Sequence, residues 1–183
     1  MDNPEFRADA LRTLSQSVTK INGMSSRLSM LSQKLELNFN DMDLNELAEE
    51  SVSDLKGYCS CPVSLNLGAV PVLSADRGQL HKVLENLLMN ACDATGPDGK
   101  IIVETSRHEN WAEVAVRDDG CGMSKDFMGK NLFRPFQTTK KKGMGIGLYH
   151  CKTIVEAHGG RIHVESEEGK GTIFKVLLPL QRQ

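Results

Sequence analysis

The sequence predicts an α+β protein, in which a long coiled-coil-like helix precedes a two-layer α/β sandwich. Two observations predict this arrangement. Apolar residues recur at heptad spacing from Leu11 to Leu35, and no proline lies between Pro4 and Pro62, which is typical of one long helix. Further along, short alternating apolar runs are separated by helical periods and glycine-rich turns. We therefore expect two domains, residues 1–38 and 41–183.

Composition excludes several classes of protein. The 183 residues are 39% hydrophobic and 25% charged, and the net charge of −2 offers no basic surface for nucleic acid. No apolar run approaches the roughly 18 residues of a membrane span, so we expect no membrane contact in this segment and a cytoplasmic location. The cysteines are odd in number and lack zinc-site spacing, so we expect reduced thiols and no metal among them.

The N-terminal segment is expected to be helical over residues 4–34, with Asn3 as its cap and Pro4 in its first turn. A helix of this length is a rod of about 45 Å. Its apolar stripe cannot be buried alone, which favours pairing with another helix. The alternative is an amphipathic helix folded onto its own domain.

The sandwich is expected to alternate strands and helices. A short strand at 35–40 precedes a helix that begins at a capping box on Asp43 and ends near Leu55. Period-2 patterns predict strands at 63–67, 70–74, 100–107, 111–118, 161–166 and 172–178. Helical patterns predict helices at 76–94, 125–131 and 146–158, the last of them ended by Gly159.

The helix at 76–94 carries two asparagines on one side. Asp76 with Gln79 forms a capping box, and the apolar positions lie on one face. Asn86 and Asn90 are four residues apart and lie together away from that face. Because asparagine is a poor residue for a helix interior, the pair indicates a partner outside the helix. Two solvated or internally bonded amides are the alternative.

The strand at 111–118 ends in a carboxylate on its apolar face. Alternation places Asp118 with the buried positions and Asp119 on the opposite side. A buried carboxylate needs a donor, and the exocyclic amine of a purine is one. Gly120 and Gly122 would let the backbone pass close to a flat ring. An ordinary Asp-Asp-Gly turn is the alternative.

A second glycine-rich segment leads directly into the helix at 146–158. The run Gly143-Met144-Gly145-Ile146-Gly147-Leu148 permits close approach, and the helix start offers free N–H groups to phosphate. Cations and aromatic residues precede it: Phe133, Arg134, Phe136, Lys140, Lys141 and Lys142. Alone, such a run is often a simple loop with solvated lysines and core phenylalanines.

The order of these segments, closed by Gly169-x-Gly171-Thr172, resembles the ATP-binding domain shared by sensor histidine kinases, gyrase, heat-shock-90 chaperones and MutL. The resemblance covers about residues 41–180. Within that group, Phe-Arg-Pro-Phe-Gln-Thr-Thr-Lys followed by Gly-Met-Gly-Ile-Gly-Leu is similar to bacterial two-component sensor histidine kinases. The narrower likeness is to membrane kinases linked to exopolysaccharide and PEP-CTERM sorting systems.

The resemblance implies a Bergerat-type fold, a mixed sheet with helices on one face, and a site for ATP and Mg²⁺. Asn90 would ligate Mg²⁺ beside Asn86, and both would be the catalytic residues. The adenine would be bound by Asp118, Gly120, Gly122 and Thr172, and the triphosphate by Lys140, Gly143, Gly145, Gly147 and Leu148. Residues 134–144 would form the ATP lid, with Phe133, Arg134, Phe136, Lys141 and Lys142 as its side chains. Asp93 departs from the family, because many sensor kinases carry Lys or Arg there.

The same resemblance favours phosphoryl transfer over hydrolysis. Hydrolysing relatives place a glutamate where this chain has Asn86, and an amide is no general base. The acceptor would be a histidine on the first helix of a dimeric hairpin whose second helix is the rod, and a response regulator would receive the phosphoryl group. All five histidines lie in the ATP-binding region, so we expect the acceptor on an upstream helix, in a homodimer of a membrane-bound sensor. The alternatives are an ATP-hydrolysing or anti-sigma-type Ser-kinase relative, and a nucleotide-independent coiled-coil adaptor.

Overall fold

The computed structural model describes residues 35–55, 57–138 and 144–181. Leu37–Gln183 group together as one compact unit. The helix predicted at 4–34, with its proposed pairing, lies outside the described residues. None of the described helices is both long enough and apolar enough to cross a membrane.

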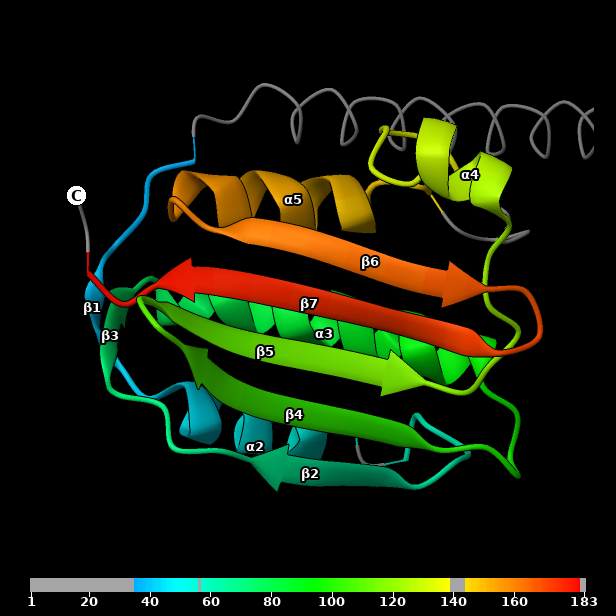
Figure 1. The fold of residues 1–183 in the computed structure, drawn as a ribbon, viewed down its shortest axis with the longest axis horizontal. Helices are drawn as coiled ribbons and strands as arrows, with labels where there is room; N and C mark the ends of the chain where they lie inside the picture. The colour runs from blue at the N-terminus through cyan, green and yellow to red at the C-terminus, as the bar shows by residue number, and fades with distance from the viewer. Residues whose placement is uncertain (1–34, 56, 139–143, 182–183) are drawn as a thin grey trace, which may run out of the picture. The chain divides into compact units, whose positions relative to one another are not determined.

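The main layer is a five-stranded mixed sheet in the order β2-β4-β5-β7-β6 (Figure 1). β2 pairs with β4 in parallel, and the other three pairings are antiparallel. The bounds are β2 Val63–Leu67, β4 Ile101–His108, β5 Trp111–Asp118, β6 Arg161–Glu167 and β7 Gly171–Pro179. The strands at positions 63–67, 100–107, 111–118, 161–166 and 172–178 are thus confirmed to within a residue or two.

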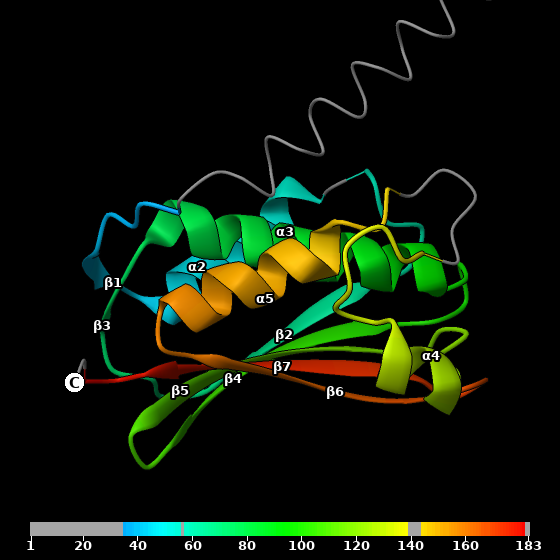
Figure 2. The same ribbon diagram turned by 90° about the horizontal axis from the view of Figure 1, so that it is seen from above.

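Three helices cover one face of this sheet (Figure 2). They are α2 Leu44–Asp54, α3 Arg77–Ala94 and α5 Gly147–Ala157, and no described helix covers the other face. A one-turn helix, α4 Lys125–Lys130, follows the β5 end. The prediction of a two-layer sandwich, with a mixed sheet and helices on one face, is therefore confirmed.

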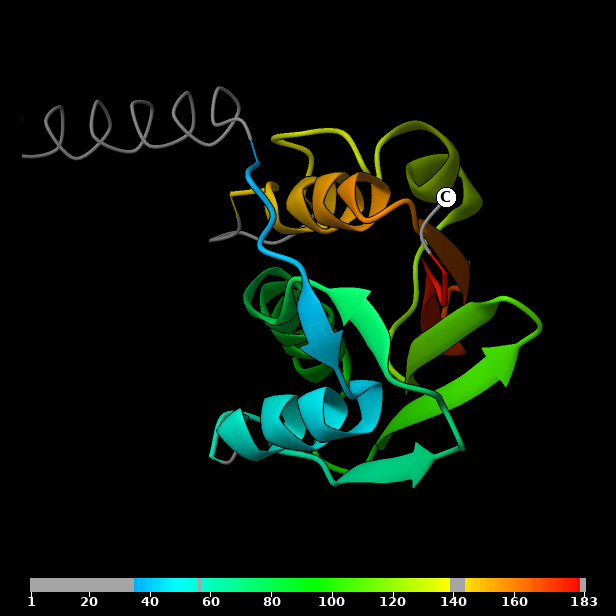
Figure 3. The same cartoon turned by 90° about the vertical axis from the view of Figure 1, so that its left-hand side faces the viewer.

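A separate two-stranded ladder corrects two predicted strands. β1 Asn40–Met42 pairs antiparallel with β3 Leu73–Ala75, apart from the main sheet (Figure 3). The strand predicted at 35–40 is wrong except for its last residue, and the strand predicted at 70–74 begins three residues too early. Three-residue strands are too short for alternation to fix their ends.

The helix termini follow the sequence closely. Asp43 accepts from the backbone N–H groups of Asn45 and Glu46, and Asp76 accepts from that of Gln79. Gly159 has φ +73°, the left-handed conformation that ends α5. The apolar face of α3 is buried against the sheet: Leu80, Val83, Leu84, Leu87, Leu88, Ala91 and Cys92. Each of its buried leucines contributes about 1.5–3 kcal/mol.

The expectation of reduced thiols is wrong for one pair of cysteines. Cys59 and Cys92 form a disulfide with their Cα atoms 5.2 Å apart. The other three cysteines are free, and Cys61 and Cys151 are buried while Cys121 is exposed. The bond joins the α2–β2 connection to the last turn of α3.

Candidate nucleotide site

The site is built on an antiparallel pair of helices, α3 and α5. At one end, the buried ring of His158 accepts the backbone N–H of Asp76 at 3.0 Å through Nε2. Its Nδ1 lies 2.7 Å from the carbonyl oxygen of Ile154, so Nδ1 carries the proton. At the other end, the start of α5 packs on Asn86. The sequence could not show this pairing, because it joins residues about 60 to 80 positions apart.

The side chain of Asn86 faces the first residue of α5. Its Nδ2 donates to the carbonyl oxygen of Lys82 at 2.8 Å, and its Oδ1 would lie 2.6 Å from a Cβ at Gly147. Only glycine fits there without displacing the amide. Asn90 lies one turn further along the same side of α3 and is half-buried. The amide of Asn86 thus lies at the start of α5.

No side chain caps α5 at its N-cap residue, Ile146. The first N–H groups of a helix have no intrahelical partner, and together with the helix dipole they favour an anion. Leu148 lies in this first turn and is half-buried. An uncapped helix start of this kind is suited to binding phosphate, and the amide of Asn86 lies beside it.

The segment before α5 is held by contacts that require unusual backbone angles. The N–H of Phe136 donates to the carbonyl oxygen of Gly145 at 2.8 Å, and these residues have φ +67° and +66°. A Cβ at Gly145 would lie 2.6 Å from the carbonyl oxygen of Gln137. Phe133 lies under the Lys152 ammonium, 5.7 Å from the ring centroid, whereas Arg134 is exposed. Lys140, Lys141, Lys142 and Gly143 lie outside the described residues.

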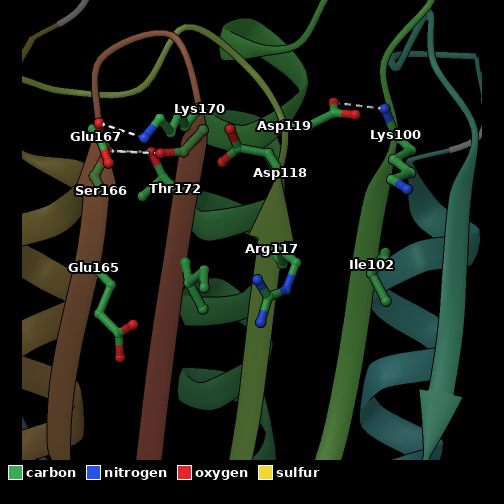
Figure 4. Close-up of a pocket in the computed structure, with 12 residues that line it drawn as sticks. Lys100, Ile102, Arg117, Asp118, Asp119, Glu165, Ser166, Glu167, Lys170 and Thr172 are labelled. Atoms are coloured by element: carbon green, nitrogen blue, oxygen red, sulfur yellow. Dashed lines mark hydrogen bonds and ion pairs between the residues drawn. The ribbon is translucent and has the colours of Figure 1, made fainter.

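Asp118 is a carboxylate in an almost fully buried position, only 5% exposed. Burial raises its pKa above the ordinary value, opposed by the backbone N–H groups of Gly120 and Thr172. The first of these donates to Oδ1 at 3.0 Å. The neighbouring Asp119 points away and accepts the N–H of Lys100 at 2.8 Å (Figure 4), so the predicted opposite orientation of the two carboxylates is confirmed.

Thr172 lies beside Asp118, because the two residues pair in register between β5 and β7. Its Oγ1 is 2.9 Å from Oγ of Ser166 (Figure 4). Ser166 also accepts the N–H of Met123 and donates to the carbonyl oxygen of Gly171, both at 2.9 Å. Sequence reasoning missed Ser166, since a serine in a strand gives no signal of such a junction.

The glycines after Asp118 let the loop pack on α3. A Cβ at Gly120 would lie 2.4 Å from the carbonyl oxygen of Ala94, and the N–H of Cys121 donates to that oxygen at 3.0 Å. Gly122, with φ +65°, would bring a Cβ within 2.0 Å of the carbonyl oxygen of Glu167. The loop after Asp118 therefore contacts Ala94, the last residue of α3, which is one helical turn beyond Asn90.

A pocket of about 430 Å³ lies on the opposite, helix-free face (Figure 4). Ile102, Arg117 and Ile173 line it, and alternation places them away from the helices. Its rim also mixes charges, since Lys170 pairs with Glu167 at 2.7 Å. Asp118 and Thr172 also line this pocket, but it lies on the face of the sheet away from the helices. Asn86 and Gly147 meet on the opposite face, where α3 and α5 lie.

Comparison with known proteins identifies the family of this chain. The family model for histidine kinase-, DNA gyrase B- and HSP90-like ATPases matches residues 75–182. Sporulation kinase C of Bacillus subtilis (strain 168) is 29% identical over 180 residues, covering 96% of this chain and 42% of the relative. Sensor histidine kinase ZraS of Escherichia coli (strain K12) is 34% identical over 173 residues, covering 92% and 37%. The chain thus spans less than half the length of these relatives.

Solved structures are similar as well. The catalytic domain of histidine kinase ThkA, in a nucleotide-free form, is 32% identical with a TM-score of 0.71, covering 78% of this chain and 96% of that one. The structure of ThkA in complex with the response regulator protein TrrA is 25% identical with a TM-score of 0.74, covering 99% and 53%.

Proposed function

Because the chain belongs to the family of histidine kinase-, DNA gyrase B- and HSP90-like ATPases, and within it is similar to sensor histidine kinases, we propose that residues 41–183 are the catalytic domain of a sensor histidine kinase. The domain would bind Mg-ATP and transfer the γ-phosphoryl group to a histidine. The narrower likeness to PEP-CTERM-associated kinases stays a prediction.

The contact between Asn86 and Gly147 carries this proposal. It supports a phosphate site in which the uncapped start of α5 donates N–H groups and Asn86 lies beside them. Asn90 would be the protein ligand of Mg²⁺, which takes oxygen ligands and is completed by phosphate oxygens and water. The metal would offset the charge of the phosphates during transfer. Gly145 and Leu148 would border the triphosphate, together with Lys140 and Gly143.

The purine would lie at the other end of the site. Asp118 is buried beside Thr172, and its carboxylate would accept the exocyclic amine of adenine. Gly120 and Gly122 let the loop pack against Ala94 and Glu167, and this packing would hold the loop beside the ring. The segment with Phe133, Arg134 and Phe136, together with Lys141 and Lys142, would be the lid.

Transfer is favoured over hydrolysis by the side chain at position 86. Asn86 cannot take a proton from water, and the adjacent residue in the sequence, Glu85, is exposed and about 100° around the helix. The buried His158 has both ring nitrogens bonded to backbone, so it is no acceptor. We therefore propose that the acceptor histidine is on an upstream helix, with a second protomer, in the cytoplasmic part of a membrane-bound sensor.

A response regulator would be the next acceptor. The proposal rests on the similarity to ThkA, whose complex with the response regulator protein TrrA has been solved. No nucleic-acid partner is proposed, because the net charge is −2.

The test has two stages. Calorimetry with the non-hydrolysable analogue AMPPNP should show binding that needs Mg²⁺ and that Asn90→Ala abolishes. The chain is then joined to its upstream segment and supplied with labelled ATP, and acid-labile phosphate on histidine is expected. Steady phosphate release that Asn90→Ala abolishes would instead indicate an ATP-hydrolysing relative. Label on a protein serine would indicate a Ser kinase, and the absence of any nucleotide binding would indicate the coiled-coil adaptor.

A further inference from the structure

Two sulfur atoms hold the α2–β2 connection against α3. Cys59 lies in this connection and Cys92 in the last helical turn, and their 5.2 Å Cα separation is within the range of about 4.4–6.8 Å that disulfides need. Cys92 is buried, 7% exposed, whereas Cys59 is half-buried. A thiol from solution would therefore reach Cys59 first.

The residues that flank Cys59 in this connection are Tyr58, which also contacts α3, and the buried Cys61. The hydroxyl of Tyr58 donates to Asp93 on α3 at 3.2 Å. Cys61, two residues beyond Cys59, is buried, and its thiol pKa is raised by burial and then by the charges of Asp119 and Asp118. The connection is thus joined to the end of α3 through both Tyr58 and Cys59.

The turn of α3 that holds Cys92 supports both ends of the nucleotide site. Asn90 precedes Cys92 by two residues, about 200° around the helix, so the disulfide lies on the side away from the amide. Ala94 follows Cys92 and accepts the N–H of Cys121, next to Gly120. Restraining this turn therefore restrains the amide and the adenine loop together.

We propose that the Cys59–Cys92 pair is a thiol–disulfide exchange site for low-molecular-weight thiols, and that its oxidised form favours nucleotide binding; the second half rests on the proposed function. A glutathione thiolate attacks Sγ of Cys59, and Cys92 leaves as a thiolate and takes up a proton. A second glutathione thiolate attacks the mixed disulfide, which frees Cys59 and releases oxidised glutathione. The pair gains two electrons, and two glutathiones lose them.

The exchange is tested on the 183-residue chain without nucleotide. The chain is equilibrated in glutathione buffers from reducing to oxidising, quenched by alkylation and weighed by mass spectrometry. The number of free thiols in the wild type should differ by two between the most reducing and the most oxidising buffer, and peptide mapping should assign these two thiols to Cys59 and Cys92. Cys61→Ser, altered two residues away, should behave in the same way, and Cys59→Ser should form no internal bond. Two alkylated thiols at these positions in every buffer would overturn the site.

The coupling is tested by calorimetry with Mg-AMPPNP in the two extreme buffers. The reduced wild type should bind at least about fivefold more weakly than the oxidised form, the lower end of typical coupling between sites. Cys59→Ser should bind as the reduced form in both buffers, and Cys61→Ser should follow the wild type. Equal affinities in both buffers would overturn the coupling. No binding in either buffer would remove the proposed function and the coupling with it, while the thiol count still decides the exchange site.

Discussion

Replacing Asp118 by asparagine should weaken nucleotide binding and leave the fold intact. The variant keeps the size of the side chain and one acceptor oxygen for the N–H of Gly120, now 3.0 Å away. It loses the negative charge that would accept the adenine amine. A hydrogen bond to a charged group contributes about 1.5–3 kcal/mol, which corresponds to an affinity loss of roughly 10- to 150-fold.

The assay is calorimetry with Mg-AMPPNP, repeated with the inosine analogue, which lacks the amine. The wild type should prefer the adenine nucleotide, and Asp118→Asn should lose most of that preference. Asp119→Asn is the matched control, because Asp119 is exposed, points away from Asp118 and accepts the N–H of Lys100 (Figure 4). Unchanged affinity in Asp118→Asn, or an equal loss in Asp119→Asn, would refute the assignment of the adenine carboxylate.

The same variant should alter the pH dependence of stability. Burial raises the pKa of Asp118 in the folded state, so the folded protein binds this proton more tightly than the unfolded chain. The wild type consequently loses stability as the pH rises through the folded-state pKa, whereas a neutral amide does not. The free energy of unfolding of Asp118→Asn relative to wild type should therefore increase from pH ~4 to pH ~7, as measured by urea denaturation. A constant difference would contradict this reading of the buried carboxylate.

Three other outcomes are expected. Gly147→Ala should lower the free energy of unfolding by about 1–3 kcal/mol and weaken Mg-AMPPNP binding, because the added Cβ would lie 2.6 Å from Oδ1 of Asn86. Gly96→Ala is the control, since a Cβ added there would have no heavy atom within 4 Å. Cys59→Ser should lower the free energy of unfolding under oxidising conditions by about 3–4 kcal/mol, because it removes a disulfide between residues 33 positions apart. An equal loss of stability under reducing conditions would contradict this prediction. The stripe Leu11–Leu35 should cause self-association, and a monomeric mass in light scattering at high concentration would argue against it.

Local signals in the sequence predicted most of the elements. The capping residue Asp76 and the apolar face of α3 are adjacent along the chain, and the alternation of β5 separated Asp118 from Asp119. These features need only the geometry of one helix or one strand. The grouping of Asn86, Asp118 and Gly147 came instead from the resemblance of the ordered segments to a known family.

Features that depend on long-range contacts could not be predicted from the sequence. The order β2-β4-β5-β7-β6 and the ladder of β1 with β3 depend on which strands meet, and short strands carry little pattern. The Cys59–Cys92 disulfide was missed because spacing along the chain does not reveal that two Cα atoms are 5.2 Å apart. Ser166 was missed for the same reason, since its partners come from two separate segments, the loop after β5 and the start of β7.

The placement of Asn86, Asn90 and Ala94 on one uninterrupted helix fixes the spacing between the two ends of the proposed nucleotide site. A residue inserted between Asn90 and Ala94 would turn everything after it by about 100° and advance it by about 1.5 Å. The amide would then no longer share a register with the loop that Ala94 supports. Insertions and deletions in this stretch should consequently be far more harmful than in the β4–β5 turn, because the proposed site needs both of its ends in register.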